Sequence, residues 1–258
     1  MKIVILAGGF GTRISEDVHR IPKPMIEIGG HPILWHIMKY YSHFGFNDFI
    51  ICCGYLANTI KDYFANYYLH GSDVTFDFKN NGRIDILNNL SEPWRVTLVD
   101  TGLNTMTGGR VARIQRYVGN ESFFLTYGDG VSNVDLYKLR DYHQSAKGVL
   151  TLTAIQLGGR FGVLNLDPQN NEVLGFLEKS PEAGGWINAG FMVANPSLFG
   201  YIKGDECSLE ADVLPVLATE KRLGAFKHYD YWQCMDTPRD KLFLEEQWRT
   251  GAAPWKVW

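Results

Sequence analysis

The chain lacks several features that would place it in a familiar class of protein. It contains no apolar run approaching the roughly 18 residues that a membrane-spanning helix needs, and its N-terminal apolar run is too short for a secretory signal. Its 258 residues carry a net charge of −3 at pH 7, so the chain lacks the excess of positive charge that is typical of proteins that bind nucleic acid or an acidic membrane. We therefore expect a cytoplasmic protein that binds neither nucleic acid nor membrane.

Cysteine and histidine patterns that bind metals are also missing. Cys52 and Cys53 are neighbours in a predicted strand, where their side chains point to opposite faces and are poorly placed to form a bridge. Cys207 and Cys234 have no C-x-x-C or histidine spacing, so a zinc site is not expected. The seven histidines form no set with ligand spacing, and we assign none of them to catalysis. All four cysteines are predicted to be reduced, buried, small apolar residues.

The remaining composition, with 45% hydrophobic and 21% charged residues, is that of an ordinary globular protein. The absence of repeats, low-complexity segments and linkers predicts one domain spanning 1–258. In the first half we expect strands 3–7, 49–53, 74–78, 84–87, 96–99 and 122–127 and helices 32–43, 58–69 and 109–117. In the second half we expect strands 148–156, 162–166, 173–178, 186–194, 225–228 and 231–235 and helices 209–220 and 238–248, the last capped by Thr237. This alternation predicts an α/β fold with a mostly parallel sheet sandwiched by helices.

The N-terminal segment is the most informative part of the sequence. Its apolar run 3–7 is typical of a strand buried on both faces of a parallel sheet. The glycine-rich loop 8–11 follows, and its backbone can approach a ligand closely and point several N–H groups at phosphate. Arg13 and Lys23 add positive charge beside this loop. The pattern predicts a nucleoside triphosphate site.

Other phosphate-binding motifs do not fit the same loop. No Gly-Lys-Ser or Gly-Lys-Thr follows it, which excludes a P-loop, and segment 9–14 lacks the third glycine of the dinucleotide fingerprint. An ordinary glycine-rich turn is the remaining alternative. Thr12-Arg13 followed by Pro22-Lys23-Pro24 argues against that alternative.

The segment 6–13 together with Pro22-Lys23-Pro24 resembles the signature of the sugar-1-phosphate nucleotidyltransferases. Segments similar to the members that use CTP and glucose 1-phosphate are 32–38, 51–55, 62–67, 92–94, 99–102, 106–110, 126–130 and 253–256. The resemblance implies a Rossmann-like fold, Mg²⁺ as cofactor, CTP and glucose 1-phosphate as substrates, and a homo-oligomer that is a hexamer or another dimer-based assembly. It also implies supply of 3,6-dideoxyhexoses for O-antigen polysaccharide.

The resemblance divides the chain into a nucleotide-binding half, 1–130, and a half for sugar phosphate and oligomer contacts, 131–258. The residues that it implies for the nucleotide are Leu6, Ala7, Gly8, Gly9, Phe10, Gly11, Thr12, Arg13, Lys23, Thr105, Gly109, Arg110 and Gly128. In catalysis, Arg13 is expected to neutralise the departing pyrophosphate and Lys23 to bridge the α-phosphate and the sugar phosphate. Arg110 could donate to the cytosine carbonyl, or it could lie on a solvated basic helix face.

Two aspartates are the metal candidates. Asp129 follows an apolar strand between two glycines, and Asp236 also lies at a strand end. Because Mg²⁺ is usually held by one or two carboxylates plus substrate phosphates, both positions suit it, and the resemblance implies the same role. The alternative for each is a cap of a turn or of the next helix.

The sugar phosphate should be bound by the second half of the chain. The resemblance implies that Glu178 accepts sugar hydroxyls, that Lys179 binds phosphate, and that Asn188 and Gly190 form the sugar-binding strand. This chain departs from the family pattern by placing Ser180 before the proline and alanine at position 189. Without the resemblance, Glu178-Lys179 could be a solvated surface pair.

Three rival functions are open at this level. A sister enzyme could use UTP, dTTP or GTP, or another sugar phosphate. A non-catalytic sensor would have lost a phosphate or metal ligand, whereas all are present here. A glycosyltransferase would be expected to carry Asp-x-Asp, and the sequence has none. The tryptophans at 255 and 258 indicate burial against the body or a partner subunit.

Overall fold

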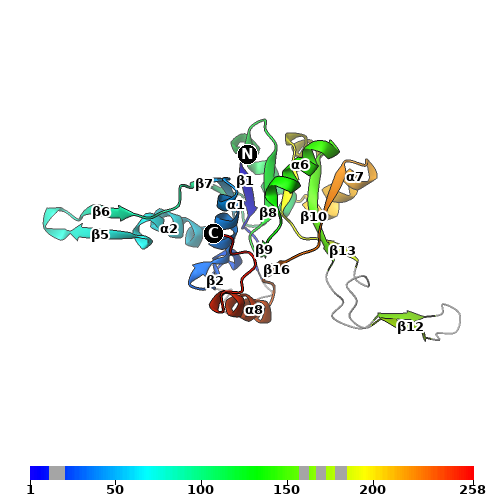
Figure 1. Cartoon of the computed structure of the whole chain (residues 1–258). Helices are drawn as coiled ribbons and strands as arrows, with labels where there is room; N and C mark the ends of the chain where they lie inside the picture. Colours follow the sequence, from blue (N-terminus) through cyan, green and yellow to red (C-terminus); the bar gives the residue numbers. More distant parts are fainter. Residues whose placement is uncertain (12–20, 157–162, 167–172, 178–184) are drawn as a thin grey trace.

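The computed structural model describes residues 1–11, 21–156, 163–166, 173–177 and 185–258. Its main sheet has the strand order β13-β10-β14-β8-β1-β4-β7, and β15 pairs with β10 on a side branch (Figure 1). These strands are β1 (Ile3–Leu6), β4 (Asp48–Cys53), β7 (Arg95–Asp100), β8 (Phe123–Tyr127), β10 (Leu150–Gln156), β13 (Trp186–Asn188), β14 (Met192–Ala194) and β15 (Leu223–His228). β8, β1, β4 and β7 run parallel, and β14 is antiparallel to β8. The predicted α/β fold with a mostly parallel central sheet is confirmed.

Helices cover both faces of this sheet. The α-helices are α1 (Ile33–His43), α2 (Ala57–Ala65), α3 (Tyr67–His70), α4 (Thr107–Arg113), α5 (Gln115–Val118), α6 (Leu136–Ala146), α7 (Leu214–Thr219) and α8 (Pro238–Arg249). Shorter helical turns are η2 (Lys23–Met25), η3 (Phe78–Asn80), η5 (Pro196–Tyr201) and the π-turn η6 (Leu209–Val213). Among the described residues, no helix is long and apolar enough to cross a membrane.

Small sheets surround the main one. They pair β2 (Glu27–Ile28) with β3 (His31–Pro32), β5 (Ser72–Asp77) with β6 (Arg83–Asn89), β9 (Gly130–Ser132) with β16 (Trp232–Cys234), and β11 (Val163–Leu166) with β12 (Val173–Leu177). The strands predicted over 74–78 and 84–87 pair with each other as the β5–β6 hairpin, which extends away from the main sheet (Figure 1).

The core consists of two clusters on opposite faces of the sheet. Strand side chains alternate between them, so that Ile3 and Ile5 pack with α1 and α8 while Val4 and Leu6 pack with α4, α5 and α7. Cys52 and Cys53 fall in different clusters, as their adjacency predicted. All four cysteines are free, but Cys234 is only half-buried, so the prediction of burial was wrong for that residue.

Several elements differ from their predicted extent. The helix expected over 58–69 breaks at Asn66, and the one over 109–117 starts at Thr107 and breaks at Ile114. The strand expected over 186–194 is interrupted at 189–191, where Gly190 and Phe191 adopt positive φ. The helix expected over 209–220 begins with the π-turn η6. Helix α6 was missed.

Candidate active site

The glycine-rich loop leaves β1 at the carboxyl edge of the main sheet. Leu6 and Ala7 have side chains buried in the core, so they can serve a ligand only through backbone atoms. Gly9 and Phe10 are exposed beyond them. The Gly128 N–H donates to the Leu6 carbonyl at 3.0 Å, which ties the carboxyl ends of β1 and β8 together. A ligand on this edge therefore meets the ends of both strands, as expected for open α/β sheets.

Arg110 lies behind the glycine-rich loop and is only 4% exposed. Its guanidinium donates to the carbonyls of Gly102 at 2.7 Å and Leu103 at 3.1 Å and to Thr101 Oγ1 at 2.8 Å. A Cβ at Gly8 would lie 2.3 Å from Arg110 Nη1, so a side chain at this position would require the hydrogen-bonded guanidinium to shift. The alternative of a solvated helix face was wrong for Arg110. Its donation to a base carbonyl stays a prediction, and that bond would compete with the ones observed.

Thr105 and Gly109 belong to the same segment. Thr105 is 8% exposed, and Thr105 Cγ2 would lie 2.7 Å from a Cβ at Gly109. That Cβ would also lie 2.6 Å from the carbonyl oxygen of Asp205. Asp205 in turn accepts two hydrogen bonds from Arg113. The predicted base-binding segment therefore packs closely against residues 205–207.

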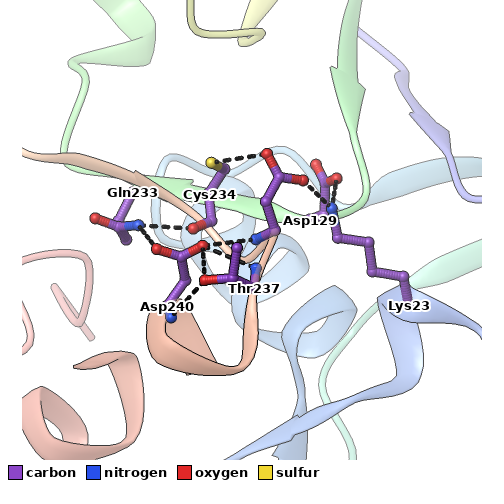
Figure 2. Close-up of polar contacts among 7 residues, drawn as sticks. Lys23, Asp129, Gln233, Cys234, Thr237 and Asp240 are labelled. Carbon is purple, nitrogen blue, oxygen red and sulfur yellow. Dashed lines mark hydrogen bonds and ion pairs between the residues drawn. The ribbon is translucent and has the colours of Figure 1, made fainter. Parts of the chain in front are cut away.

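Lys23 and the two candidate metal ligands form one cluster, of which Figure 2 labels Lys23 and Asp129. Nζ of Lys23 lies 2.6 Å from Oδ2 of Asp129 and 2.5 Å from Oδ1 of Asp236. Burial disfavours the charge on Lys23, but the two carboxylates outweigh burial and raise its pKa. The lysine side chain is 12% exposed, against 30% and 37% for the two aspartates. Lys23 therefore keeps its positive charge at neutral pH, and the cluster is more open to ligands on the carboxylate side.

Asp236 is held in place by the backbone on either side of it. The Met235 N–H donates to the Asp129 carbonyl at 2.9 Å, so both aspartates are fixed relative to each other. Helix α8 begins directly after Asp236 with a capping box between Thr237 and Asp240, and Asp240 Oδ2 also accepts the Asp236 N–H at 3.2 Å. Thr237 was predicted as the cap, whereas the contribution of Asp240 was missed. The T-x-x-D spacing is the signal that could have found it.

The donor set fits a hard divalent cation. Two carboxylates from different strand ends converge on one point, and the Lys23 ammonium at that point shows that it suits a positive charge. Carboxylate oxygens are the ligands that Mg²⁺ prefers. Within the described residues, no group of three or more His, Cys, Asp or Glu side chains could hold a metal. Mg²⁺ bound by one or two carboxylates usually takes its other ligands from substrate phosphates and water.

The predicted sugar-binding residues lie beside the end of β8. Asn188 Oδ1 accepts the Gly190 N–H at 2.9 Å, and Asn188 Nδ2 donates to the Tyr127 hydroxyl at 3.2 Å. Gly190 has φ +74°, and a Cβ there would lie 2.9 Å from the Tyr127 ring. The structure thus places Asn188 and Gly190 against Tyr127, which lies two residues before Asp129. Thr12, Arg13, Glu178 and Lys179 lie outside the described residues.

An α/β sheet with a glycine-rich loop after its first strand, and a partly buried lysine between two carboxylates at strand ends, is the arrangement expected of a nucleotidyltransferase. The family model described as nucleotidyl transferase matches residues 2–241, and the chain belongs to that family. The resemblance to this family that the sequence suggested is therefore confirmed.

Full-length relatives with named activities are also similar to this chain. The chain is 52% identical to the glucose-1-phosphate cytidylyltransferases of Salmonella typhi and Salmonella typhimurium, over all of this chain and all of each relative. A probable glucose-1-phosphate cytidylyltransferase of Bacillus subtilis is 40% identical over the same extent.

Solved structures show the same fold. HddC from Yersinia pseudotuberculosis complexed with GMP-PN is 26% identical, with a TM-score of 0.65 over 96% of this chain and 99% of the other. A UDP-glucose pyrophosphorylase complexed with UDP-glucose is 17% identical, with a TM-score of 0.68 over 97% and 98%. The second likeness shows the fold alone.

Proposed function

We propose that the protein transfers CMP from CTP to α-D-glucose 1-phosphate, giving CDP-glucose and pyrophosphate. The observation that carries this proposal is the convergence of Lys23, Asp129 and Asp236 beside the glycine-rich loop. Glucose-1-phosphate cytidylyltransferases 52% identical over their full length support the choice of substrates.

The reaction forms one P–O bond and breaks another. An oxygen of the sugar phosphate attacks the α-phosphorus of CTP, and the bond to the β-phosphate breaks so that pyrophosphate leaves with the electron pair. The attacking oxygen is already ionised at neutral pH, so no general base is needed. The protein contributes positioning and charge neutralisation.

Each residue of the site has a role in this proposal. Backbone N–H groups of loop 8–11 hold the triphosphate, and Lys23 neutralises the α-phosphate and the incoming sugar phosphate. Asp129 and Asp236 would hold Mg²⁺, which when bound supplies charge neutralisation and orientation of the phosphates. We extend the proposal to Arg13 for pyrophosphate and to Glu178 and Lys179 for the sugar phosphate. Asn188 is proposed to bind a sugar hydroxyl.

The assembly and the setting belong to the same proposal. We expect a homo-oligomer in the cytoplasm that supplies a CDP-hexose for surface polysaccharide. Exposed apolar side chains on the β5–β6 hairpin, including Phe78 at 84% and Leu87 at 65% exposure, support a subunit contact. Trp255, only 1% exposed, packs instead within the body of the same chain.

The test is pyrophosphate release with glucose 1-phosphate, Mg²⁺ and one of CTP, UTP, dTTP or GTP, with products identified by mass. Release with CTP well above the others, and a CDP-hexose product, is expected. Preference for another nucleotide would keep the reaction type and overturn the cytidylyl assignment. No pyrophosphate release with any of the four nucleotides would contradict the proposed reaction with glucose 1-phosphate.

A further inference from the structure

Glu210 lies where the predicted nucleotide-binding and sugar-binding segments meet. Its Oε1 accepts the Tyr127 hydroxyl at 2.6 Å, and its Oε2 accepts the Thr107 hydroxyl at 2.6 Å. A third bond comes from Ser208 Oγ at 3.1 Å. These partners belong to β8, α4 and the segment before η6. One carboxylate therefore connects three parts of the fold that are distant in sequence.

The Tyr127 arm leads toward the sugar side. A carboxylate can only accept, so Tyr127 must give its single proton to Glu210, and the Tyr127 oxygen is left to accept from Asn188 Nδ2 at 3.2 Å. Asn188 Oδ1 accepts the Gly190 N–H. The orientation of the Asn188 amide thus depends on the Glu210 acceptor, to which it is connected through the Tyr127 hydroxyl.

The Thr107 arm leads toward the nucleotide side. Thr107 Oγ1 accepts the Leu209 N–H at 2.8 Å, so its own proton is free to be donated to Glu210. Thr107 is the first residue of α4, which carries Gly109 and Arg110. Met106 and Gly109 also donate backbone N–H groups to the carbonyls of Asp205 and Cys207. The start of α4 is therefore fixed to the segment that carries Glu210.

We propose that Glu210 is a positioning residue that orients the sugar-binding side of the site through Tyr127 and the nucleotide-binding side through Thr107. This inference rests on the proposed function for the identity of the two substrates. Glu210 makes no contact with a reacting atom in the proposal. Its effect is on the binding of both substrates, because each arm ends in a segment predicted to bind one of them.

The kinetic test separates the two arms. Tyr127→Phe keeps the ring against Gly190 and removes only the hydroxyl, so the KM for glucose 1-phosphate should rise about fivefold while the KM for CTP stays within about twofold. Thr107→Val should raise the KM for CTP about fivefold and leave the KM for glucose 1-phosphate within about twofold. Glu210→Ala should raise both KM values, and adding Tyr127→Phe to it should raise the KM for glucose 1-phosphate no further. The kcat should fall by less than about threefold in each variant.

The chain contains a matched control pair. Tyr201 donates to Glu220 at 2.7 Å, and Arg222 donates to the Tyr201 hydroxyl at 3.1 Å. As at Tyr127, a tyrosine hydroxyl donates to a glutamate and accepts a hydrogen bond from a side-chain N–H. This pair lies at the amino end of β15, whereas Asn188 pairs with Ala154 near the carboxyl end of β10. Glu220→Ala should leave both KM values within about twofold of wild type.

A measurement without substrates distinguishes failure of this inference from failure of the proposed function. In the ligand-free protein, the side-chain ¹⁵NH₂ resonances of Asn188 should shift in Glu210→Ala and in Tyr127→Phe, but not in Glu220→Ala. Those resonances are assigned by their loss in Asn188→Asp. Wild-type protein that releases no pyrophosphate would overturn the proposed reaction, whereas the inference that Glu210 orients Asn188 would still stand on these resonances.

Unchanged Asn188 resonances in Glu210→Ala would overturn the inference, and so would unchanged KM values in an active enzyme. A KM rise of the same size in Glu220→Ala would also overturn it, because the effect would then be a general one. Thermal unfolding of each variant checks that the folded protein is measured. If Glu210→Ala does not fold, Tyr127→Phe carries the same test through the same resonances.

Discussion

Nζ of Lys23 lies 2.6 Å from Oδ2 of Asp129, although 106 positions separate the two residues in the chain. Asp236 Oδ1 lies 2.5 Å from the same nitrogen. The ammonium therefore occupies the point on which both candidate metal ligands converge. Since one point between two carboxylates cannot hold two cations, we expect metal binding to release Lys23 toward the phosphates. This relationship links the roles predicted separately for the lysine and the aspartates.

Replacing either member of this pair should abolish most of the activity. Lys23→Ala removes the charge proposed to neutralise the reacting phosphates, and Asp129→Ala removes a proposed metal ligand. We expect each to lower kcat by about a hundredfold or more while the protein stays folded. Steady-state pyrophosphate release and thermal unfolding are the measurements. Lys138→Ala, which removes a lysine with a 77% exposed side chain, is the control and should keep normal turnover. Near-normal turnover in both site variants would contradict the assignment.

The same geometry predicts opposite effects on metal affinity. In the absence of substrates, Lys23→Ala should bind Mg²⁺ more tightly than wild type, because the competing ammonium is gone. Asp236→Asn should bind it more weakly, by about tenfold, because one of two carboxylate ligands becomes neutral. Calorimetric titration with Mg²⁺ measures both, and Asp141→Asn on the surface is the control. Weaker Mg²⁺ binding by Lys23→Ala would show that the lysine and the metal do not share this point.

Two neighbouring glycines should respond differently to the same substitution. A Cβ at Gly8 would lie 2.3 Å from Arg110 Nη1, whereas a Cβ at Gly9 would have no neighbour within 4 Å. Gly8→Ala should therefore lower the free energy of unfolding by about 1–3 kcal/mol through overpacking. Gly9→Ala should leave it within about 0.5 kcal/mol and raise only the KM for the nucleotide. Urea unfolding and steady-state kinetics test this difference. Equal stability of the two variants would mean that Arg110 moves aside at little cost.

The sequence predicted the parts of this site that depend on local chemistry. Strand Ile3–Leu6 was found from its continuous apolar run, and the N-cap Thr237 from its position before Pro238. Asp129 and Asp236 were chosen because each follows an apolar strand, and the structure brings their carboxylates to one cation. The family came from the resemblance of spaced motifs, and the family model that matches residues 2–241 confirms it. The proposed reaction came from the same resemblance and is the one for which full-length relatives are named.

Contacts between distant segments could not be predicted in the same way. Arg110 has the sequence environment of a basic helix, and only the folded chain shows carbonyls from residues 102 and 103 surrounding it. Glu210 carries no motif, since its partners lie 83 and 103 positions away. Helix α6 was missed because only Leu136, Leu139 and His143 of its residues are buried, which leaves a weak apolar period. In each case tertiary packing, which no local pattern encodes, decides the outcome.

His36 makes the stability of the fold depend on pH. It is fully buried, and its Nε2 donates to the Ile28 carbonyl at 2.8 Å while its Nδ1 accepts from Trp255 Nε1 at 3.4 Å. A proton on Nδ1 would face the Trp255 N–H. Burial is the main reason that the pKa of His36 falls to about 4 from its usual 6.5. Between these two values the unfolded chain binds more protons, so stability is full above pH 6.5 and is lost as pH falls toward 4.

The expected size follows from that shift. Between pH 7.5 and pH 5.0, His36 alone should lower the free energy of unfolding by about 2 kcal/mol. Urea unfolding of wild type at the two pH values, compared with His36→Gln, isolates this contribution because the variant cannot titrate there. His43→Gln, at the exposed end of the same helix, should keep the wild-type loss. If His36→Gln loses as much stability on acidification as wild type, other groups cause the pH dependence, and the Ile28–His36–Trp255 contact does not require a neutral imidazole.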